Sequence, residues 1–183
     1  MRIRGEARAV VGLLVLVGIV VGVRLWCTVV QAGVYYKHVA APRLAPVLEG
    51  AVYRVVDGDT FDVVANSDTL RVRVSAIDAP EHDQPWGGMA TAEGRALLQG
   101  KRVTLAVVTR DRYGRVVASV GLPDGRDYGA AMVSQGLAWW YREYSGRHGD
   151  YAALEAAARA ARAGLWVQPG AVPPWVWRAQ KRR

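Results

Sequence analysis

Acidic and basic side chains gather at the ends of three short apolar runs in the second quarter of the chain. The turn Asp57–Thr60 joins the first two runs, and Asp78-Ala79-Pro80-Glu81 follows a third run that carries Arg73. A strand end is a position from which a rigid sheet can aim a side chain at a fixed point. The carboxylates of Asp59 and Asp78 therefore predict a weak site for a hard divalent cation, completed by water and a phosphate oxygen.

Other polar residues near these carboxylates suit chemistry on a phosphate ester. Glu81 stands just beyond the rigid Pro80, so we expect it to activate or orient an attacking water. Arg73 and Arg115 are expected to bind phosphate oxygens as charge develops on them. Arg112 and Tyr113 lie in the turn before Arg115. We expect them to hold a terminal phosphate or to stack on a base.

Each of these features also has a purely structural interpretation. Asp57-Gly58 is a favoured hairpin-turn pair, and residues 78–81 are compatible with a strand exit or a helix start. Arg73 alone is compatible with a solvated strand residue. The aromatic run Trp139-Trp140-Tyr141 is interpreted as core rather than as a platform for bases. The order of the motifs, taken together, favours a catalytic site.

Period-two and period-3.6 patterns predict the elements that must position these side chains. Five short strands with helices between and after them indicate an α+β fold, and a small closed barrel is the economical way to bury their apolar faces. We expect no regular element after residue 173, where Pro173-Pro174-Trp175 opens a basic tail. The predicted strands are 52–56, 61–65, 70–77, 102–109 and 115–122, and the predicted helices are 89–99, 127–136 and 150–163.

Composition narrows the class of protein. The chain has 183 residues and a net charge of +8, which favours an anionic partner such as nucleic acid. Its single cysteine, Cys27, excludes an intrachain disulfide. Its three histidines lack metal-ligand spacing, which argues against a zinc site.

The first 36 residues predict a signal peptide or a transmembrane signal-anchor. Arg2, Arg4 and Arg8 precede the apolar run 9–23, as in an export signal. Continuing this run past Arg24 gives the roughly 20 residues that a membrane span needs. Cleavage after Ala32 and an uncleaved anchor with its amino terminus in the cytoplasm both remain open, and the long apolar stretch favours the anchor. Either one predicts an extracytoplasmic protein, secreted or membrane-anchored.

The remaining chain divides into three parts by composition. Residues 37–49, which include two prolines, are predicted to be a linker. Residues 50–178 carry the strand and helix patterns and are predicted to form the globular domain. Residues 179–183 form a basic tail.

Five stretches in this order resemble the staphylococcal nuclease (thermonuclease) family, across about residues 50–178. The matching stretches are V-V-D-G-D-T (55–60), V-R-V-S-A-I-D-A-P-E (72–81), D-R-Y-G-R (111–115), L-A-W-W-Y (137–141) and A-R-A-G-L-W (161–166). The resemblance implies a five-stranded OB-fold β-barrel with three helices. It also implies calcium-dependent cleavage of DNA and RNA to products that carry 3′-phosphates.

The resemblance also assigns roles to individual residues. It implies that Asp59, Asp78 and the backbone carbonyl of Ala79 bind Ca²⁺. Glu81 corresponds to the catalytic glutamate, and Arg73 and Arg115 correspond to the two catalytic arginines. Tyr113 and Arg112 correspond to contacts with the substrate phosphate. Ala76 stands where many bacterial members have glycine.

A different class of function remains possible for the same fold. An OB-fold barrel also serves as a non-catalytic module that binds nucleic acid or protein, here tethered to the membrane. The presence of Glu81, Arg73 and Arg115 favours the enzyme. The sequence indicates no particular protein partner, and it leaves open the preference between DNA and RNA and between internal and terminal cleavage.

Overall fold

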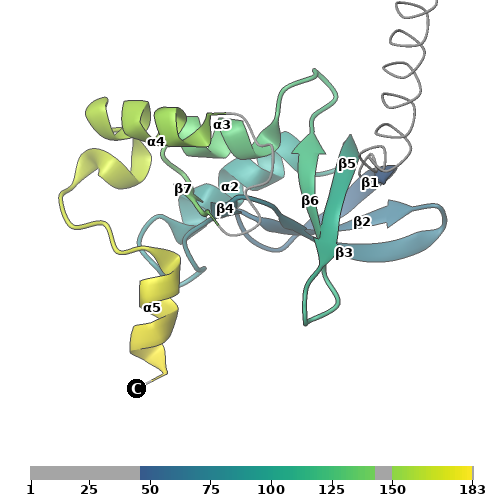
Figure 1. The fold of residues 1–183 in the computed structure, drawn as a ribbon, viewed down its shortest axis with the longest axis horizontal. Helices are drawn as coiled ribbons and strands as arrows, with labels where there is room; N and C mark the ends of the chain where they lie inside the picture. The colour runs from purple at the N-terminus through teal and green to yellow at the C-terminus, as the bar shows by residue number, and fades with distance from the viewer. Residues whose placement is uncertain (1–45, 143–149, 183) are drawn as a thin grey trace, which may run out of the picture. The chain divides into compact units, whose positions relative to one another are not determined.

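The computed structural model describes residues 46–142 and 150–182 (Figure 1). The predicted signal or anchor (residues 1–36) and residues 37–45 of the predicted linker lie outside this part of the chain. The segment Ala45–Arg183 forms one compact unit, whose first strand begins at Val47, inside the range predicted as linker. No helix among the described residues is long and apolar enough to cross a membrane.

Five strands close into a barrel in the order β1-β2-β3-β6-β5, which confirms the predicted five-stranded barrel. Neighbouring strands are antiparallel, except that β3 and β6 run parallel. This closed barrel with its helices fits the expected α+β OB-fold. The strands are β1 (Val47–Val55), β2 (Thr60–Ala65), β3 (Asp68–Val74), β5 (Arg102–Arg110) and β6 (Val116–Gly121).

Alternating side chains along the strands fill the barrel. In β3, Val72 and Val74 are buried while Arg71 is exposed and Arg73 is half-buried. This period of two is the pattern of a strand with one face on a core. A shift of one residue in register would exchange the buried valines for arginines, so the core fixes the register. Arg73 is therefore held on the outer side of the barrel wall.

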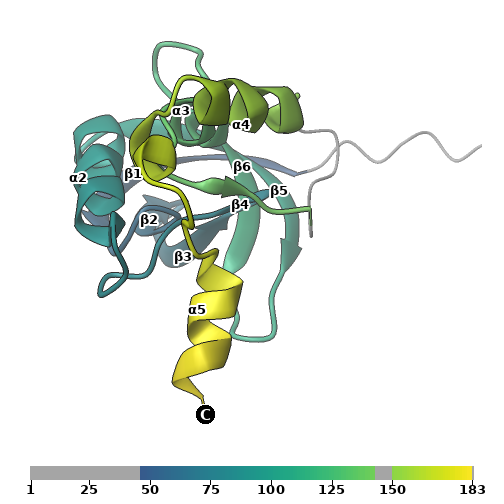
Figure 2. The same ribbon diagram turned by 90° about the vertical axis from the view of Figure 1, so that its left-hand side faces the viewer.

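Three helices near their predicted positions cover part of the barrel. They are α2 (Gly87–Leu98), α3 (Tyr128–Ser134) and α4 (Tyr151–Ala160). Asp127 caps α3 by accepting a hydrogen bond from the backbone N–H of Ala130, and Asp150 caps α4 in the same way from Ala153. Both helices begin where a side-chain oxygen satisfies an otherwise unpaired backbone donor. Helices α3 and α4 lie side by side in both ribbon views (Figures 1 and 2).

The segment after residue 173 is helical, which corrects the prediction of an irregular tail. The fourth helix of the described residues, α5 (Pro174–Lys181), begins with a proline in its first turn. Proline suits this position because its missing N–H would have no partner there anyway, and its fixed φ matches the helix. A run of only eight residues gave too little periodicity to be recognised against the Pro-Pro pair. Figure 2 shows α5 projecting from the domain.

A second, two-stranded sheet joins the carboxyl-terminal half to the barrel. Strand β4 (Ile77–Asp78) pairs with β7 (Trp139–Trp140), so that Asp78 lies opposite Trp139. Trp139 is buried and packs edge-on against Trp166 of the short 3₁₀ helix η1 (Gly164–Val167). Trp139 is thus a core residue, as predicted, and it fixes the strand that carries Asp78.

Candidate active site

Two aspartates from separate strand ends meet at one guanidinium group. Asp59 immediately precedes β2, and Asp78 ends β4. Arg73 of β3 places its Nη1 3.0 Å from Asp59 Oδ2 and its Nη2 2.8 Å from Asp78 Oδ1. The side chains of Asp59 and Asp78 are only 8% and 1% exposed. Asp59 and Asp78, which the sequence analysis expected strand ends to aim at one point, therefore lie beside Arg73, which it expected to bind phosphate oxygens.

Backbone pairing explains why the three side chains converge. Thr60 of β2 lies opposite Arg73 of β3, and the backbone N–H of Val74 donates to the carbonyl of Asp59 at 2.8 Å. The N–H of Ala79 donates to Asp59 Oδ2 at 2.7 Å. Asp59 is therefore fixed both by the barrel ladder and by the residue that follows Asp78.

The turn before Asp59 is held closely against its neighbours. Asp57 Oδ1 accepts from the N–H of Asp59 at 2.9 Å, and the hydroxyl of buried Tyr128 in α3 donates to the carbonyl of Gly58 at 2.8 Å. A Cβ on Gly58 would lie 2.7 Å from the Cβ of Ala79 and 2.9 Å from that of Ala90. Only glycine fits there. The Asp-Gly pair is thus more than a hairpin turn, because it is wedged between α2 and the residue after Asp78.

The site concentrates negative charge in a poorly hydrated place. Burial, followed by the nearby charge of Asp59, raises the pKa of Asp57 from 3.8 to about 7. The same two causes raise the pKa of Asp78, although bonds from Arg178 and the charge of Arg73 oppose the increase. Carboxylates with raised pKa values in one cleft are common at functional sites. A bound cation would favour their ionised forms.

Glu81 reaches the same group of carboxylates through a residue that the sequence analysis did not predict. Arg178 of α5 donates from Nη2 to Asp78 Oδ2 at 2.8 Å and from Nη1 to Glu81 Oε1 at 2.6 Å. These contacts outweigh the desolvation of the guanidinium, so the pKa of Arg178 lies above its ordinary value. The ending P-P-W-V-W-R (residues 173–178) resembles bacterial members of the family, but without α5 it did not indicate what Arg178 contacts. We call Asp59, Arg73, Asp78, Glu81 and Arg178 the carboxylate cluster.

The remaining predicted residues form a separate group, which we call the arginine turn (residues 111–115). Asp111 accepts from the Nε of Arg115 at 2.7 Å and from the backbone N–H groups of Tyr113 and Arg115. The guanidinium groups of Arg112 and Arg115 lie 4.9 and 5.6 Å from the centre of the Tyr113 ring. Arg115 is thus engaged with its own turn, whereas Arg73 is engaged with the carboxylates.

Strand pairing relates the arginine turn to the carboxylate cluster. The turn leads into β6, whose Val116 and Val117 lie opposite Val72 and Arg73 of β3. Both ribbon views show this turn and α5 projecting from the same side of the barrel (Figures 1 and 2). Tyr113 is 69% exposed. The turn therefore offers cationic and aromatic groups to a ligand that approaches from solvent.

The donor set fits a hard divalent cation that is only partly enclosed by protein. No group of three or more His, Cys, Asp and Glu side chains suited to hold a metal occurs within residues 46–142 and 150–182. Two buried carboxylates, Asp59 and Asp78, are nevertheless brought to one point, with the backbone of Ala79 beside Asp59. Oxygen-only donors of this number suit Ca²⁺ or Mg²⁺ with water and a phosphate oxygen completing the shell, and they do not suit zinc.

Comparison with known proteins gives the same assignment as the motifs. Residues 71–168 match the family described as staphylococcal nuclease homologue. An uncharacterised endonuclease of Escherichia coli is 40% identical over 140 residues, which cover 76% of this chain and 91% of that protein. A micrococcal nuclease of Shigella flexneri is 41% identical over 139 residues, covering 70% of this chain and 79% of that protein. The chain therefore belongs to the staphylococcal nuclease family.

Proposed function

We propose that this protein is a calcium-dependent nuclease that hydrolyses phosphodiester bonds of DNA and RNA and leaves 3′-phosphates. The observation that carries the proposal is the meeting of Asp59 and Asp78 on the guanidinium of Arg73, with Glu81 linked to the same group through Arg178. Nuclease function follows from the family, and both relatives described above are named as nucleases. The metal, the substrate range and the residue roles are the proposed part.

Asp59, Asp78 and the carbonyl of Ala79 would hold the calcium ion. Bound there, Ca²⁺ would supply Lewis-acid polarisation of a phosphoryl oxygen and neutralise part of the charge of the phosphate. Burial of both carboxylates keeps the site poorly hydrated, which strengthens such electrostatic interactions. The weak two-carboxylate site also suits an extracytoplasmic setting, where calcium modules work at roughly 10⁻⁴–10⁻³ M.

Each of the other side chains of the site has its own role in the reaction. Glu81 accepts a proton from a water molecule, whose oxygen forms a bond to phosphorus. The bond from phosphorus to the 5′-oxygen breaks, and this oxygen takes a proton from solvent water and leaves as a hydroxyl group, while the phosphate stays on the 3′-oxygen. Glu81 then releases the proton that it accepted to solvent. Arg73 and Arg115 donate hydrogen bonds to phosphate oxygens as their charge increases in the transition state. Arg112 and Tyr113 hold a neighbouring phosphate or stack on a base.

Cleavage of single-stranded DNA and RNA by the purified full-length protein tests this proposal. We expect activity with calcium, none with EDTA, and losses of at least about 100-fold in kcat for Glu81→Gln and Arg115→Ala. Phosphatase treatment of the products should release phosphate from their 3′ ends. Glu49→Gln and Arg102→Ala are matched controls, because both side chains are at least 70% exposed and pair only loosely, at 3.8 Å.

Two outcomes would contradict separate parts of the proposal. Activity that persists in EDTA would remove calcium from the mechanism. Binding of single-stranded DNA without cleavage under any divalent cation would favour the non-catalytic binding module.

We also propose that the domain works outside the cytoplasm, secreted or tethered by residues 1–36. The support is the basic and then apolar pattern of that segment. Protease added to intact cells should degrade the domain, or the domain should be recovered in the medium. Protection of the domain in intact cells would contradict the proposal.

A further inference from the structure

Helix α5 brings a second arginine into the carboxylate cluster, 100 positions beyond Asp78 along the chain. Arg178 makes a two-pronged contact with Asp78, with Nη2 2.8 Å from Oδ2 and Nη1 3.3 Å from Oδ1. The same Nη1 lies 2.6 Å from Glu81 Oε1. One planar guanidinium therefore joins the expected metal ligand to the expected base. This helix lies beyond residues 71–168, which the family comparison matches.

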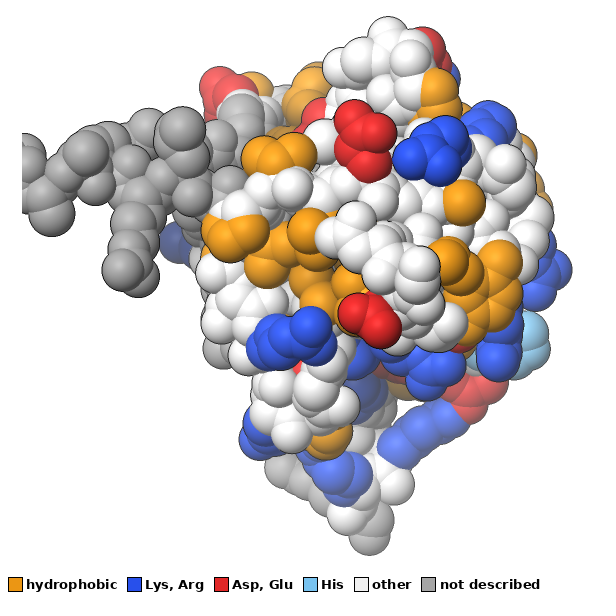
Figure 3. Space-filling model, turned by 90° about the vertical axis from the view of Figure 1, so that its right-hand side faces the viewer, with side chains coloured by type: hydrophobic (Ala, Val, Ile, Leu, Met, Phe, Trp, Pro, Cys, Tyr) orange, Lys and Arg blue, Asp and Glu red, His pale blue; other side chains and the backbone are white. Residues whose placement is uncertain are grey.

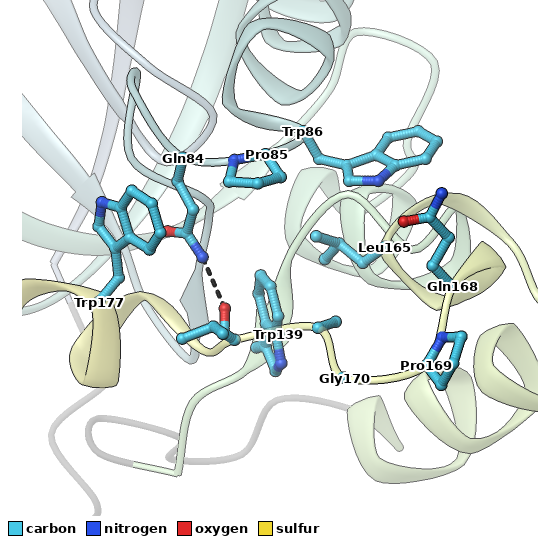
Figure 4. Close-up of a pocket in the computed structure, with 11 residues that line it drawn as sticks. Gln84, Pro85, Trp86, Trp139, Leu165, Gln168, Pro169, Gly170 and Trp177 are labelled. Carbon is cyan, nitrogen blue, oxygen red and sulfur yellow. Dashed lines mark hydrogen bonds between the residues drawn. The ribbon is translucent and has the colours of Figure 1, made fainter.

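Several contacts hold α5 against the loop that carries Glu81. The buried side chain of Gln84 donates from Nε2 to the carbonyl of Val172 at 2.6 Å (dashed line in Figure 4). Asp83 accepts a hydrogen bond from the indole of Trp177 and forms an ion pair with Lys181. The residues before α5 and two of its turns are thus tied to residues 83 and 84. This docking determines where Arg178 reaches.

Glu81 depends on these same elements at both its backbone and its carboxylate. Its backbone N–H donates to Gln84 Oε1 at 3.1 Å, and Gln84 is the residue that holds Val172. The Glu81 carboxylate is 36% exposed and lies on a loop, where its rotamer would otherwise be mobile. Arg178 restrains one of its oxygens and leaves the other for a further partner.

We propose that Arg178 is a positioning residue of the active site, which orients Glu81 for proton transfer while holding Asp78. This inference rests on the proposed nuclease function and assigns α5 to the same site. The planar fork of arginine accounts for the residue type, because it contacts two carboxylates with fixed relative angles, whereas a lysine ammonium is a single point charge. A misplaced catalytic group lowers the rate of the chemical step and has little effect on substrate affinity.

The steady-state kinetics of Arg178→Ala test the proposal. We expect kcat to fall at least about tenfold while KM changes less than about twofold. Arg112→Ala in the arginine turn is expected to change mainly KM, because Arg112 is assigned to phosphate binding. Arg182→Ala is the matched control: it removes the same charge next to the same helix from an exposed residue and should leave both constants unchanged.

Two further measurements separate positioning from a merely structural role. Methylguanidinium should restore part of the kcat of Arg178→Ala, without effect on Arg112→Ala. Arg178→Lys should unfold in urea like wild type and show a kcat between those of wild type and Arg178→Ala. Wild-type protein that is active while Arg178→Ala keeps its full kcat would overturn this inference alone. The inference would also be overturned if Arg178→Ala and Arg178→Lys both lost kcat in proportion to their loss of stability and methylguanidinium restored none of the kcat of Arg178→Ala. Arg178 would then have a structural role only. Inactive wild-type protein would overturn the proposed function, and this inference with it.

Discussion

Asp57, Asp59 and Asp78 place three carboxylates around one turn and one strand end, and the fold partly compensates them. Arg73 contacts Asp59 and Asp78, while Arg178 contacts Asp78. Asp57 accepts a hydrogen bond from the backbone N–H of Asp59. Burial, followed by the nearby charge of Asp59, nevertheless raises the pKa of Asp57 to about 7. The fold therefore maintains a local excess of negative charge that opposes folding. A site that stores such repulsion is suited to binding a cation.

Asp57→Asn should stabilise the protein without calcium, and only at higher pH. The unfolded carboxyl ionises near 3.8, whereas the folded one ionises near 7. The folded state therefore binds the extra proton between these values, and the stability that Asp57 contributes is lost as the pH rises through 7. Asparagine keeps the acceptor oxygen for the N–H of Asp59 and removes the charge. Urea unfolding in EDTA should show the variant more stable than wild type at pH 8 and equal to it near pH 4.

Asp124→Asn is the control, because the pKa of Asp124 is shifted in the opposite direction from that of Asp57. Hydrogen bonds from Arg126 lower the pKa of Asp124, so its contribution to stability is present above the ordinary pKa and is lost as the pH falls. This variant should gain nothing at pH 8. An Asp57→Asn protein that is less stable than wild type at pH 8 would show that its carboxylate stabilises the turn when charged.

Helix α2 and Ala79, the residue after strand β4, pack so closely against the 57–60 turn that Gly58 is critical. A Cβ at Gly58 would lie within 3 Å of the Cβ atoms of Ala79 and Ala90, both of which are buried. Gly58→Ala should therefore lower the free energy of unfolding by about 1–3 kcal/mol. It should also lower kcat at least about tenfold, because the turn that moves carries Asp59. Urea unfolding and the nuclease assay measure the two effects.

Gly88→Ala in α2 is the matched control for the same chemical change. No atom outside its own helix turn lies within 4 Å of the position where its Cβ would stand. Alanine is the better helix former, so stability should stay equal or rise by no more than about 1 kcal/mol. If Gly58→Ala were tolerated as well as Gly88→Ala, the turn would not be wedged between the two elements.

The sequence was sufficient to predict the strands and helices with clear periodicity and to identify the polar side chains at their ends. The alternation of Val72 and Val74 with Arg71 and Arg73 predicted the barrel strand. The placement of Asp59 and Asp78 at strand ends, together with the order of the motifs, predicted that they belong to one site. Sequence could not predict what Arg178 contacts, since that depends on how a short helix docks through Gln84 and Asp83. It also could not show that Ala76 adopts a φ of 60°, a conformation that suits glycine better.

The positive charge of the chain is not all gathered at one place, whereas the arginine turn groups two basic side chains. The chain carries +8, yet basic side chains are spread among apolar and uncharged ones over the face in Figure 3. The arginine turn instead groups Arg112 and Arg115 around Tyr113. Long-range attraction of a polyanion depends on the net charge, whereas the salt dependence of binding counts the phosphates that are contacted.

Arg112→Ala and Arg126→Ala lower the net charge equally, and we expect them to differ in salt dependence. Both arginines are exposed, but Arg112 belongs to the arginine turn, while Arg126 pairs with Asp124 at 2.7 Å in another turn. For single-stranded DNA in EDTA, the slope of log K against log salt should become less steep by about 0.7 for Arg112→Ala, because one phosphate contact is lost. Arg126→Ala should keep the wild-type slope. Equal changes in both variants would mean that the overall charge attracts the strand and that the arginine turn has no special part in binding it.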